Sequence, residues 1–151
     1  MQDEFPTIST LHDFQLSPSR RPRILVQTAG HVTGAVRFYK PEEYPELGDK
    51  KHYPVCHHPV WGGWFALRGV VIFPGVTADI QMVEPVRMLS DIQAVDMIKL
   101  YNECWQDWRW RDTGREGEGE KYSEEQIKYF ETLPAERFGL IDSLVGGACP
   151  S

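Results

Sequence analysis

Apolar residues recur at offsets of three and four between Ile24 and Tyr39, which is the spacing of an amphipathic helix. Pro22 stands just before this stretch, and its fixed φ suits the first turn of a helix. Gly30 and Gly34 each weaken such a helix by roughly 1 kcal/mol relative to alanine, and they leave one of its faces flat. We therefore expect a helix from Ile24 to Tyr39 with a flat, glycine-containing face.

A second apolar pattern, "FALRGVVIF" at residues 65–73, is interrupted by a single charged residue and ends before Pro74 and Gly75. A nearly continuous apolar run of this length, bounded by a turn signal, indicates a strand that is buried on both faces. We therefore expect a strand from Phe65 to Phe73 with neighbours on each side.

The second half of the chain predicts further helices. The first runs from about Ser90 to Asp112, with Ser90 as its N-cap. Its apolar stripe is formed by Met97, Tyr101, Trp105 and Trp108. Another helix begins at Ser123, which has capping-box spacing to Gln126. The apolar segment "ERFGLIDSL" closes the packed part of the chain.

Few strands and several helices place the chain in the α+β class. Its 151 residues suit one domain with its own core, and no internal repeat is visible. We therefore expect a single domain over residues 1–151, with disordered tails at residues 1–10 and 145–151.

Composition and charge indicate the cellular compartment and exclude some classes of binding partner. The formal net charge is −6, which disfavours binding to nucleic acid or to an anionic membrane surface. No apolar run approaches the roughly 20 residues of a membrane-spanning helix, and the N-terminus lacks the pattern of a signal peptide. Three distant cysteines, Cys56, Cys104 and Cys149, suit a reducing compartment. We expect a cytoplasmic protein that binds neither nucleic acid nor membranes.

Two histidine-containing segments are candidates for metal binding. The tract "HYPVCHHP" offers His52, Cys56, His57 and His58. Zinc sites usually bring four ligands at recognisable spacings, and this tract has no C-x-x-C pair or second cluster. "HVTG" at residues 31–34 has the H-x-x-G spacing of enzymes in which a histidine binds the cobalt of cobalamin, but Ala29 replaces their ring-orienting aspartate. We predict no metal site and a hydrogen-bonded helix histidine at His31.

Two features near the centre of the chain have more than one interpretation. Gly62 and Gly63 could hold phosphate, but no nucleotide-binding pattern surrounds them, and paired glycines more often allow close approach of another backbone or a flat ligand. Arg68, Arg111 and Arg137 stand beside apolar segments, where arginine usually binds a carboxylate of the protein or of a ligand. The carboxylates of the protein that could serve are those of Asp107, Asp112 and Glu136.

Four long strings closely resemble the methylmalonic aciduria and homocystinuria type C family and occur in the same order. They are "SRRPRILVQTAGHVTGA", "HHPVWGGWFALRGVVIFPG", "WQDWRWRD" and "YSEEQIKYFETLPAERFGLI". The resemblance covers the chain from about Leu11 to Leu144. It implies an N-terminally shortened member, because family members begin well before the segment that matches Leu11. It also implies an α+β fold related to flavin reductases and nitroreductases.

The resemblance implies an intracellular enzyme that binds cobalamin with its lower base detached and removes its upper axial ligand. Cyanide leaves by flavin-dependent reduction with FAD or FMN, and alkyl groups pass to glutathione. The implied activities are therefore those of a cyanocobalamin reductase and a glutathione-dependent alkylcobalamin dealkylase. A downstream cobalamin-trafficking protein is an implied partner.

By resemblance, ten positions contact cobalamin. These are Asp13, Ile24, Leu25, Val26, Gln27, Phe38, Tyr39, Lys40, Cys56 and Leu67. Phe38 and Lys40 replace a tyrosine and a glutamine of the family, which removes a hydroxyl and adds a charge. Arg68, Arg111 and Arg137 match the arginines that bind glutathione, whose two carboxylates an arginine can hold bidentately. No catalytic residue and no flavin site are identified.

Two alternatives from other functional classes stay open. The chain could be a cobalamin-binding carrier without turnover, or a flavin reductase that does not act on cobalamin. Loss of an N-terminal part would also leave apolar surface exposed, and such surface drives association. A homodimer is therefore a further candidate assembly.

Overall fold

The computed structural model of the chain describes residues 8–77, 82, 84–115, 119–133 and 135–146. They belong to two compact units, Met1–Gly117 and Glu118–Ser151. Most of each expected tail lies outside the described residues, but Ser9 and Thr10 belong to a strand and the last helix extends to Gly146, so both expected tails are too long. The single domain expected over residues 1–151 stays a prediction. Within the described residues, no helix is long and apolar enough to cross a membrane.

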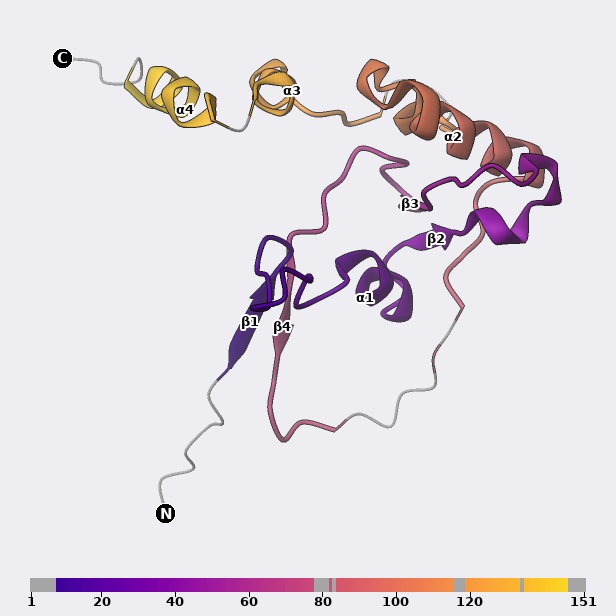
Figure 1. Ribbon diagram of the computed structural model, residues 1–151, viewed down its shortest axis with the longest axis horizontal. Coiled ribbons are helices and arrows are strands. Elements are labelled where there is room, and N and C mark those ends of the chain that lie inside the picture. The colour runs from indigo at the N-terminus through magenta and orange to yellow at the C-terminus, as the bar shows by residue number, and fades with distance from the viewer. Residues whose placement is uncertain (1–7, 78–81, 83, 116–118, 134, 147–151) are drawn as a thin grey trace. The chain divides into compact units, whose positions relative to one another are not determined.

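The first unit contains two small antiparallel sheets (Figure 1). In one, β1 (Ser9–His12) pairs with β4 (Gly69–Ile72), so that Ser9 faces Ile72 and His12 faces Gly69. In the other, β2 (Arg37–Tyr39) pairs with β3 (Val55–His57), so that Phe38 faces Cys56. Helices and antiparallel strands in one unit confirm the α+β class.

The first predicted helix is only half as long as expected. Helix α1 (Val26–Val32) ends before Gly34, whose φ of +77° is a left-handed conformation that side chains disfavour. The chain then straightens into β2, so the prediction of a helix as far as Tyr39 was wrong. The helical spacing of apolar residues in the sequence continues beyond Gly34, but residues 37–39 form a strand because their backbone pairs with β3.

The predicted strand at residues 65–73 is confirmed only in its second half. Strand β4 begins at Gly69, and its side chains at Val71 and Ile72 are exposed. The expectation of burial on both faces was wrong, because β4 has a single described partner strand and most of its side chains face solvent.

Helix α2 (Asp91–Cys104) begins where the sequence predicted. Ser90 accepts a hydrogen bond from the Gln93 N–H, and the Gln93 side chain accepts one from the Ser90 N–H. The helix ends at Cys104, eight residues earlier than predicted. Two short 3-10 turns follow, η3 (Trp105–Asp107) and η4 (Arg109–Asp112), joined by Trp108 with a left-handed φ of 64°. The apolar stripe is therefore broken, and Trp105 is exposed.

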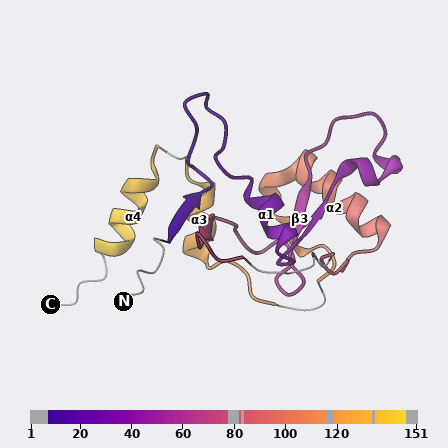
Figure 2. The same ribbon diagram turned by 90° about the horizontal axis from the view of Figure 1, so that it is seen from below.

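The core of the first unit lies between α2 and the β2–β3 sheet (Figure 2). Its fully buried side chains include Tyr39, Met97 and Ile98. The Tyr39 hydroxyl accepts a hydrogen bond of 3.2 Å from the Leu89 N–H, so this buried polar group is satisfied. Two 3-10 turns, η1 (Pro41–Glu43) and η2 (Pro45–Leu47), connect β2 to the segment before β3.

The second unit contains α3 (Glu124–Glu131) and α4 (Arg137–Gly146). The predicted capping box is confirmed, since Ser123 and Gln126 exchange hydrogen bonds at the start of α3. At the start of α4, the Arg137 guanidinium donates to the carbonyls of Thr132 and Phe130. It also lies 4.8 Å from the Tyr129 ring centroid.

Candidate functional site

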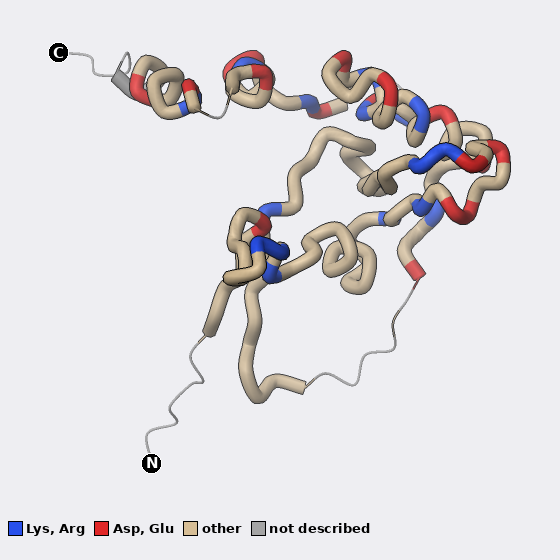
Figure 3. Tube along the Cα trace, in the orientation of Figure 1, with Lys and Arg blue, Asp and Glu red and all other residues tan. Residues whose placement is uncertain are grey.

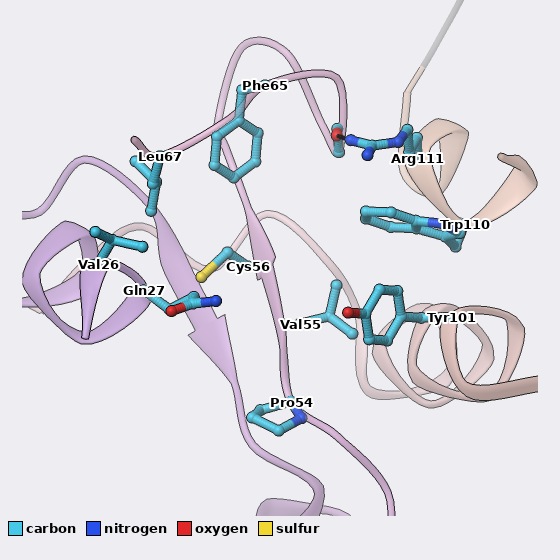
Figure 4. Close-up of a pocket in the computed structure, with 11 residues that line it drawn as sticks. Val26, Gln27, Pro54, Val55, Cys56, Phe65, Leu67, Tyr101, Trp110 and Arg111 are labelled. Carbon is cyan, nitrogen blue, oxygen red and sulfur yellow. Dashed lines mark hydrogen bonds between the residues drawn. The ribbon is translucent and has the colours of Figure 1, made fainter. Parts of the chain in front are cut away.

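A cavity of about 150 Å³ opens in the first unit, where α1, β3, the segment after β3 and η4 meet (Figure 4). Residues from far-apart parts of the sequence line it. They are Val26, Gln27, Pro54, Val55, Cys56, Gly63, Phe65, Leu67, Tyr101, Trp110 and Arg111. Four of the residues predicted to contact cobalamin and one predicted to bind glutathione are therefore brought together.

The four predicted cobalamin contacts gather on one side of the cavity in Figure 4: Val26, Gln27, Cys56 and Leu67. Cys56 is half-buried in β3 between the buried residues Val55 and His57, and both Val55 and Cys56 line the cavity. Burial raises the pKa of the Cys56 thiol to about 12, so this sulfur stays protonated at neutral pH.

Arg111 lies on the other side of the cavity, beside Trp110 and Tyr101 in Figure 4. Its guanidinium carbon is 4.3 Å from the ring centroid of Trp110, 4.9 Å from that of Trp108 and 5.8 Å from that of Trp64. It also donates a hydrogen bond to the Gly63 carbonyl. Three indole faces and one carbonyl thus hold the cation in place.

Gly63 allows this arrangement. A Cβ atom at Gly63 would lie 2.6 Å from the Arg111 Cα, a separation that real side chains do not adopt. The Gly63 N–H donates a 3.0 Å hydrogen bond to the Arg111 carbonyl. The structure therefore confirms close backbone approach as the reason for the paired glycines.

The walls of the cavity are otherwise uncharged. Figure 3 shows α1 and residues 52–67 without lysine, arginine, aspartate or glutamate. Among the described residues that line the cavity, Arg111 carries the one formal charge. A cation among apolar side chains attracts an anion more strongly than one in water, because the surrounding dielectric constant is lower.

Asp13 and Arg68, which were expected to bind different ligands, pair with each other. The Arg68 guanidinium lies 2.9 Å from the Asp13 carboxylate, and the Asp13 N–H donates to the Arg68 carbonyl at 3.0 Å. The pair stands where β1 ends and β4 begins, and neither residue lines the cavity. Asp13 was absent from the protein carboxylates considered for Arg68 in the sequence.

Five other predicted cobalamin contacts do not line the cavity. Ile24 is half-buried and Leu25 is exposed, both just before α1. Phe38 is half-buried in β2, Tyr39 belongs to the core, and Lys40 is exposed after β2. Their contacts with cobalamin stay predictions, as does the role of Arg137, which lies in the second unit.

Each histidine considered as a metal ligand has a hydrogen-bond partner. His31 Nδ1 accepts from the Phe38 N–H at 3.3 Å, which confirms a hydrogen-bonded histidine in α1. His52 and His57 donate to the carbonyls of Lys50 and Thr113. His58 Nδ1 accepts from the N–H groups of Val60 and Trp61. Across the described ranges, no three potential ligands are placed to hold a metal ion.

Sequence reasoning missed Phe65, Tyr101 and Trp110 as walls of the cavity. Tyr101 was placed in the apolar stripe of a predicted helix, and no role was predicted for Trp110. The signal that could have found them is the aromatic density of residues 101–110, which exceeds what one helix face can bury.

The methylmalonic aciduria and homocystinuria type C family matches the chain over residues 1–141. The chain belongs to this family. A Gallus gallus protein named cyanocobalamin reductase / alkylcobalamin dealkylase is 43% identical over 138 residues, covering 89% of this chain and 57% of that protein. A Homo sapiens protein of the same name is 39% identical over 138 residues, covering 89% of this chain and 48% of that protein.

A solved structure from the family has a similar fold. The C. elegans B12-trafficking protein CblC superposes with a TM-score of 0.76 at 33% identity, covering 89% of this chain and 55% of that protein. This similarity agrees with the mixed helix and sheet architecture, while the relation to nitroreductases stays a prediction. The chain spans about half the length of the curated relatives that it matches.

Proposed function

We propose that this chain binds cobalamin and takes part in removing its upper axial ligand, as a cyanocobalamin reductase and alkylcobalamin dealkylase. One observation carries the proposal: the cavity joins Val26, Gln27, Cys56 and Leu67 on one side to Arg111 on the other. Membership of the family and the names of the relatives support the same reading.

The volume of the cavity limits what can enter it. About 150 Å³ equals the liquid volume of roughly five water molecules, whereas sites for drug-sized ligands usually measure about 300–1,000 Å³. A corrin ring is therefore too large to enter, and we place it across the opening against Val26 and Leu67. The space of the cavity beneath the ring then suits the upper axial ligand and one end of a second substrate.

For dealkylation, glutathione would be the second substrate, with a carboxylate held by the Arg111 guanidinium. Its thiolate attacks the cobalt-bound carbon, a carbon–sulfur bond forms, and both electrons of the cobalt–carbon bond stay on cobalt. The chain supplies position, which lowers the barrier because two soluble reactants are held in line. The protonated Cys56 thiol does not compete as a nucleophile, since the thiolate is the reactive form.

For decyanation, a reduced flavin would supply the electrons and cyanide would leave as the anion. The chain's own part is to hold cobalamin with the lower base detached and to keep water from its upper face with apolar walls. Phe65, Leu67 and Trp110 are the side chains suited to that exclusion.

The proposal is tested by adding hydroxocobalamin to the chain and recording the visible spectrum. We expect a shift to the base-off form that saturates with protein. Gln27→Ala should weaken binding by roughly three- to tenfold, the effect of losing one hydrogen bond to the rim of the corrin. His31→Ala should keep the base-off spectrum, because His31 is engaged by the Phe38 N–H and is not a cobalt ligand.

Absence of any spectral change would contradict cobalamin binding and leave the flavin reductase alternative. With cyanocobalamin and reduced FMN, a base-off shift without cyanide release would identify a carrier without turnover. Loss of the shift in His31→Ala, with the fold retained by circular dichroism, would mean that His31 binds cobalt.

A further inference from the structure

A second, larger hollow lies in the first unit, beside the C-terminal end of α2. It is an open groove of about 580 Å³, lined by Lys50, Lys51, Tyr53, Tyr101, Asn102 and Trp105. This volume lies within the range of about 300–1,000 Å³ that small-molecule sites occupy. Nothing in the proposed cobalamin chemistry uses it.

The backbone around the groove is fixed by hydrogen bonds. The Asn102 side chain accepts from the Tyr53 N–H at 2.7 Å and donates to the Tyr53 carbonyl at 3.0 Å. The same amide donates to the Ile98 carbonyl within α2. Buried His52 donates to the Lys50 carbonyl at 2.7 Å, which fixes the turn at residues 50–52, while Asn102 joins Tyr53 to α2. The groove is therefore preformed, which lowers the entropic cost of binding.

Two aromatic rings in the groove face solvent. Tyr53 is 65% exposed and Trp105 is 60% exposed. Within the described residues, neither ring stacks on another aromatic ring. Tryptophan in particular gains from burial, so these faces suit a planar ligand that stacks on them.

The groove is also cationic, in a chain whose net charge is −6. Lys50 and Lys51 bring two ammonium groups from consecutive residues, and ammonium groups bind phosphate as point charges. Glu103 lies beside them, with its carboxylate 3.7 Å from the Lys50 ammonium. Both partners are more than half exposed, so the attraction between them is weak and an incoming anion can replace Glu103.

From these observations we propose that the groove is a second binding site, which takes a mononucleotide. The aromatic base stacks on Trp105 and Tyr53, and the phosphate lies between Lys50 and Lys51. A phosphate monoester carries a charge of about −1.5 to −2 at neutral pH, which two lysines match. The site shares Tyr101 with the cavity, but a mononucleotide can bind to it in the absence of cobalamin.

Adenosine 5′-monophosphate (AMP) is the probe, and the indole N–H resonance of Trp105 in the full chain reports binding. This resonance is assigned from its absence in Trp105→Phe. We expect a saturable shift with AMP, and at least about tenfold weaker binding of adenosine or of inorganic phosphate, each of which loses one half of the contacts. The experiment contains no cobalamin, so its outcome is distinct from that of the base-off titration.

Charge variants test the placement of the phosphate. Replacing both Lys50 and Lys51 by alanine should weaken AMP binding by about tenfold, since two charge-assisted contacts are lost. Lys99→Ala removes an exposed lysine of α2 outside the groove and should leave AMP binding unchanged. Glu103→Gln should tighten AMP binding by about two- to fivefold and leave adenosine binding unchanged, because it frees Lys50.

Three outcomes would overturn the proposal. The first is a Trp105 signal that does not shift with AMP at millimolar concentration. The second is equal binding of AMP and inorganic phosphate, which would mean that the aromatic rings hold nothing. The third is an equal effect of the Lys99 variant and the Lys50 and Lys51 double variant, which would mean that the lysines of the groove do not hold the phosphate.

Discussion

The two sheets of the first unit are both two-stranded, antiparallel and only three or four residues long, yet their surroundings differ. The β2–β3 sheet is covered by α2, and Val55 at the start of β3 is 3% exposed. The β1–β4 sheet is open, and Val71 in β4 is 56% exposed. An isolated pair of strands is only marginally stable in water. We therefore expect the β2–β3 sheet to be more stable than the β1–β4 sheet because it is buried, since both have the same kind of strand pairing.

The difference also separates two kinds of candidate site residue. The covered sheet supplies Val55 and Cys56 to the cavity, where neighbouring walls fix their positions. The open sheet ends at the Asp13–Arg68 pair, which is in contact with solvent. A small ligand loses the least entropy where the covered sheet already holds the side chains in place. The exposed ion pair contributes little to stability, so its two members can exchange partners at little cost in free energy.

Removing the same two methyl groups from each sheet tests the contrast directly. Val55→Ala should lower the free energy of unfolding by about 2.5 kcal/mol, through lost apolar burial and a new cavity in the core. Val71→Ala is the matched control and should change the same free energy by less than about 0.5 kcal/mol. Urea denaturation measures both. Equal losses would mean that β4 is covered in solution, as a homodimer through this sheet would require.

Two of the three arginines predicted to bind glutathione, Arg68 and Arg111, lie in the first unit and extend the contrast to function. Under the proposed dealkylation, Arg111→Ala should raise the activation free energy of glutathione-dependent demethylation of methylcobalamin by about 2 kcal/mol, close to a thirtyfold loss. Arg68→Ala should cost less than tenfold, since its side chain is 65% exposed and it pairs at the surface, where such contacts contribute about 0–1 kcal/mol.

Arg109→Ala provides the control from the same turn, because Arg109 is exposed and bonds to Asp107 at 2.7 Å. It should leave demethylation unchanged. Cobalamin binding is measured in parallel by the base-off spectrum. If Arg111→Ala weakens binding and demethylation equally, the arginine supports the fold and does not bind glutathione.

His57 gives the covered sheet a dependence on pH. Burial is the main cause that lowers the pKa of His57 below its usual value of 6.5, while its hydrogen bond to Thr113 opposes this and the charges of His58 and Arg115 add to it. The unfolded chain therefore takes up a proton at a pH where the folded chain does not. The free energy of unfolding should fall as pH drops below 6.5, by at most about 1.4 kcal/mol per pH unit.

His57→Gln should remove most of this slope, as measured by urea denaturation between pH 5 and 7.5. His58, whose pKa burial also lowers, should contribute a smaller part because it is less buried. A slope that is unchanged in His57→Gln would show that another group takes up the proton.

The sequence predicted where helices begin better than where they end. Ser90 and Ser123 were found as N-caps because capping is local, with each donor and acceptor three residues apart. The ends of the helices were missed at Gly34 and at Trp108. The left-handed backbone of Trp108 depends on a contact with a distant residue, because its ring stacks on that of Trp64 with 5.9 Å between the centroids. No local sequence pattern predicts such a conformation.

The candidate site was predicted in part. The resemblance named Val26, Gln27, Cys56, Leu67 and Arg111, and the fold brings these five together. The spacing of residues along the sequence could not predict this grouping, because the cavity depends on the pairing of β2 with β3 and on the close approach of Arg111 to Gly63. For the same reason, the pairing of Asp13 with Arg68 follows from the β1–β4 register and was not visible in the sequence.

Tyr101 lines both the cavity and the groove, and its ring meets that of Trp110 edge to face at 4.9 Å. A ligand that shifts this ring on one side changes the shape of the wall on the other. Thermodynamic linkage then requires reciprocity: whatever factor one ligand imposes on the affinity of the second, the second imposes on the first. A single aromatic side chain thus gives two neighbouring sites a means to act cooperatively, with no movement of a domain.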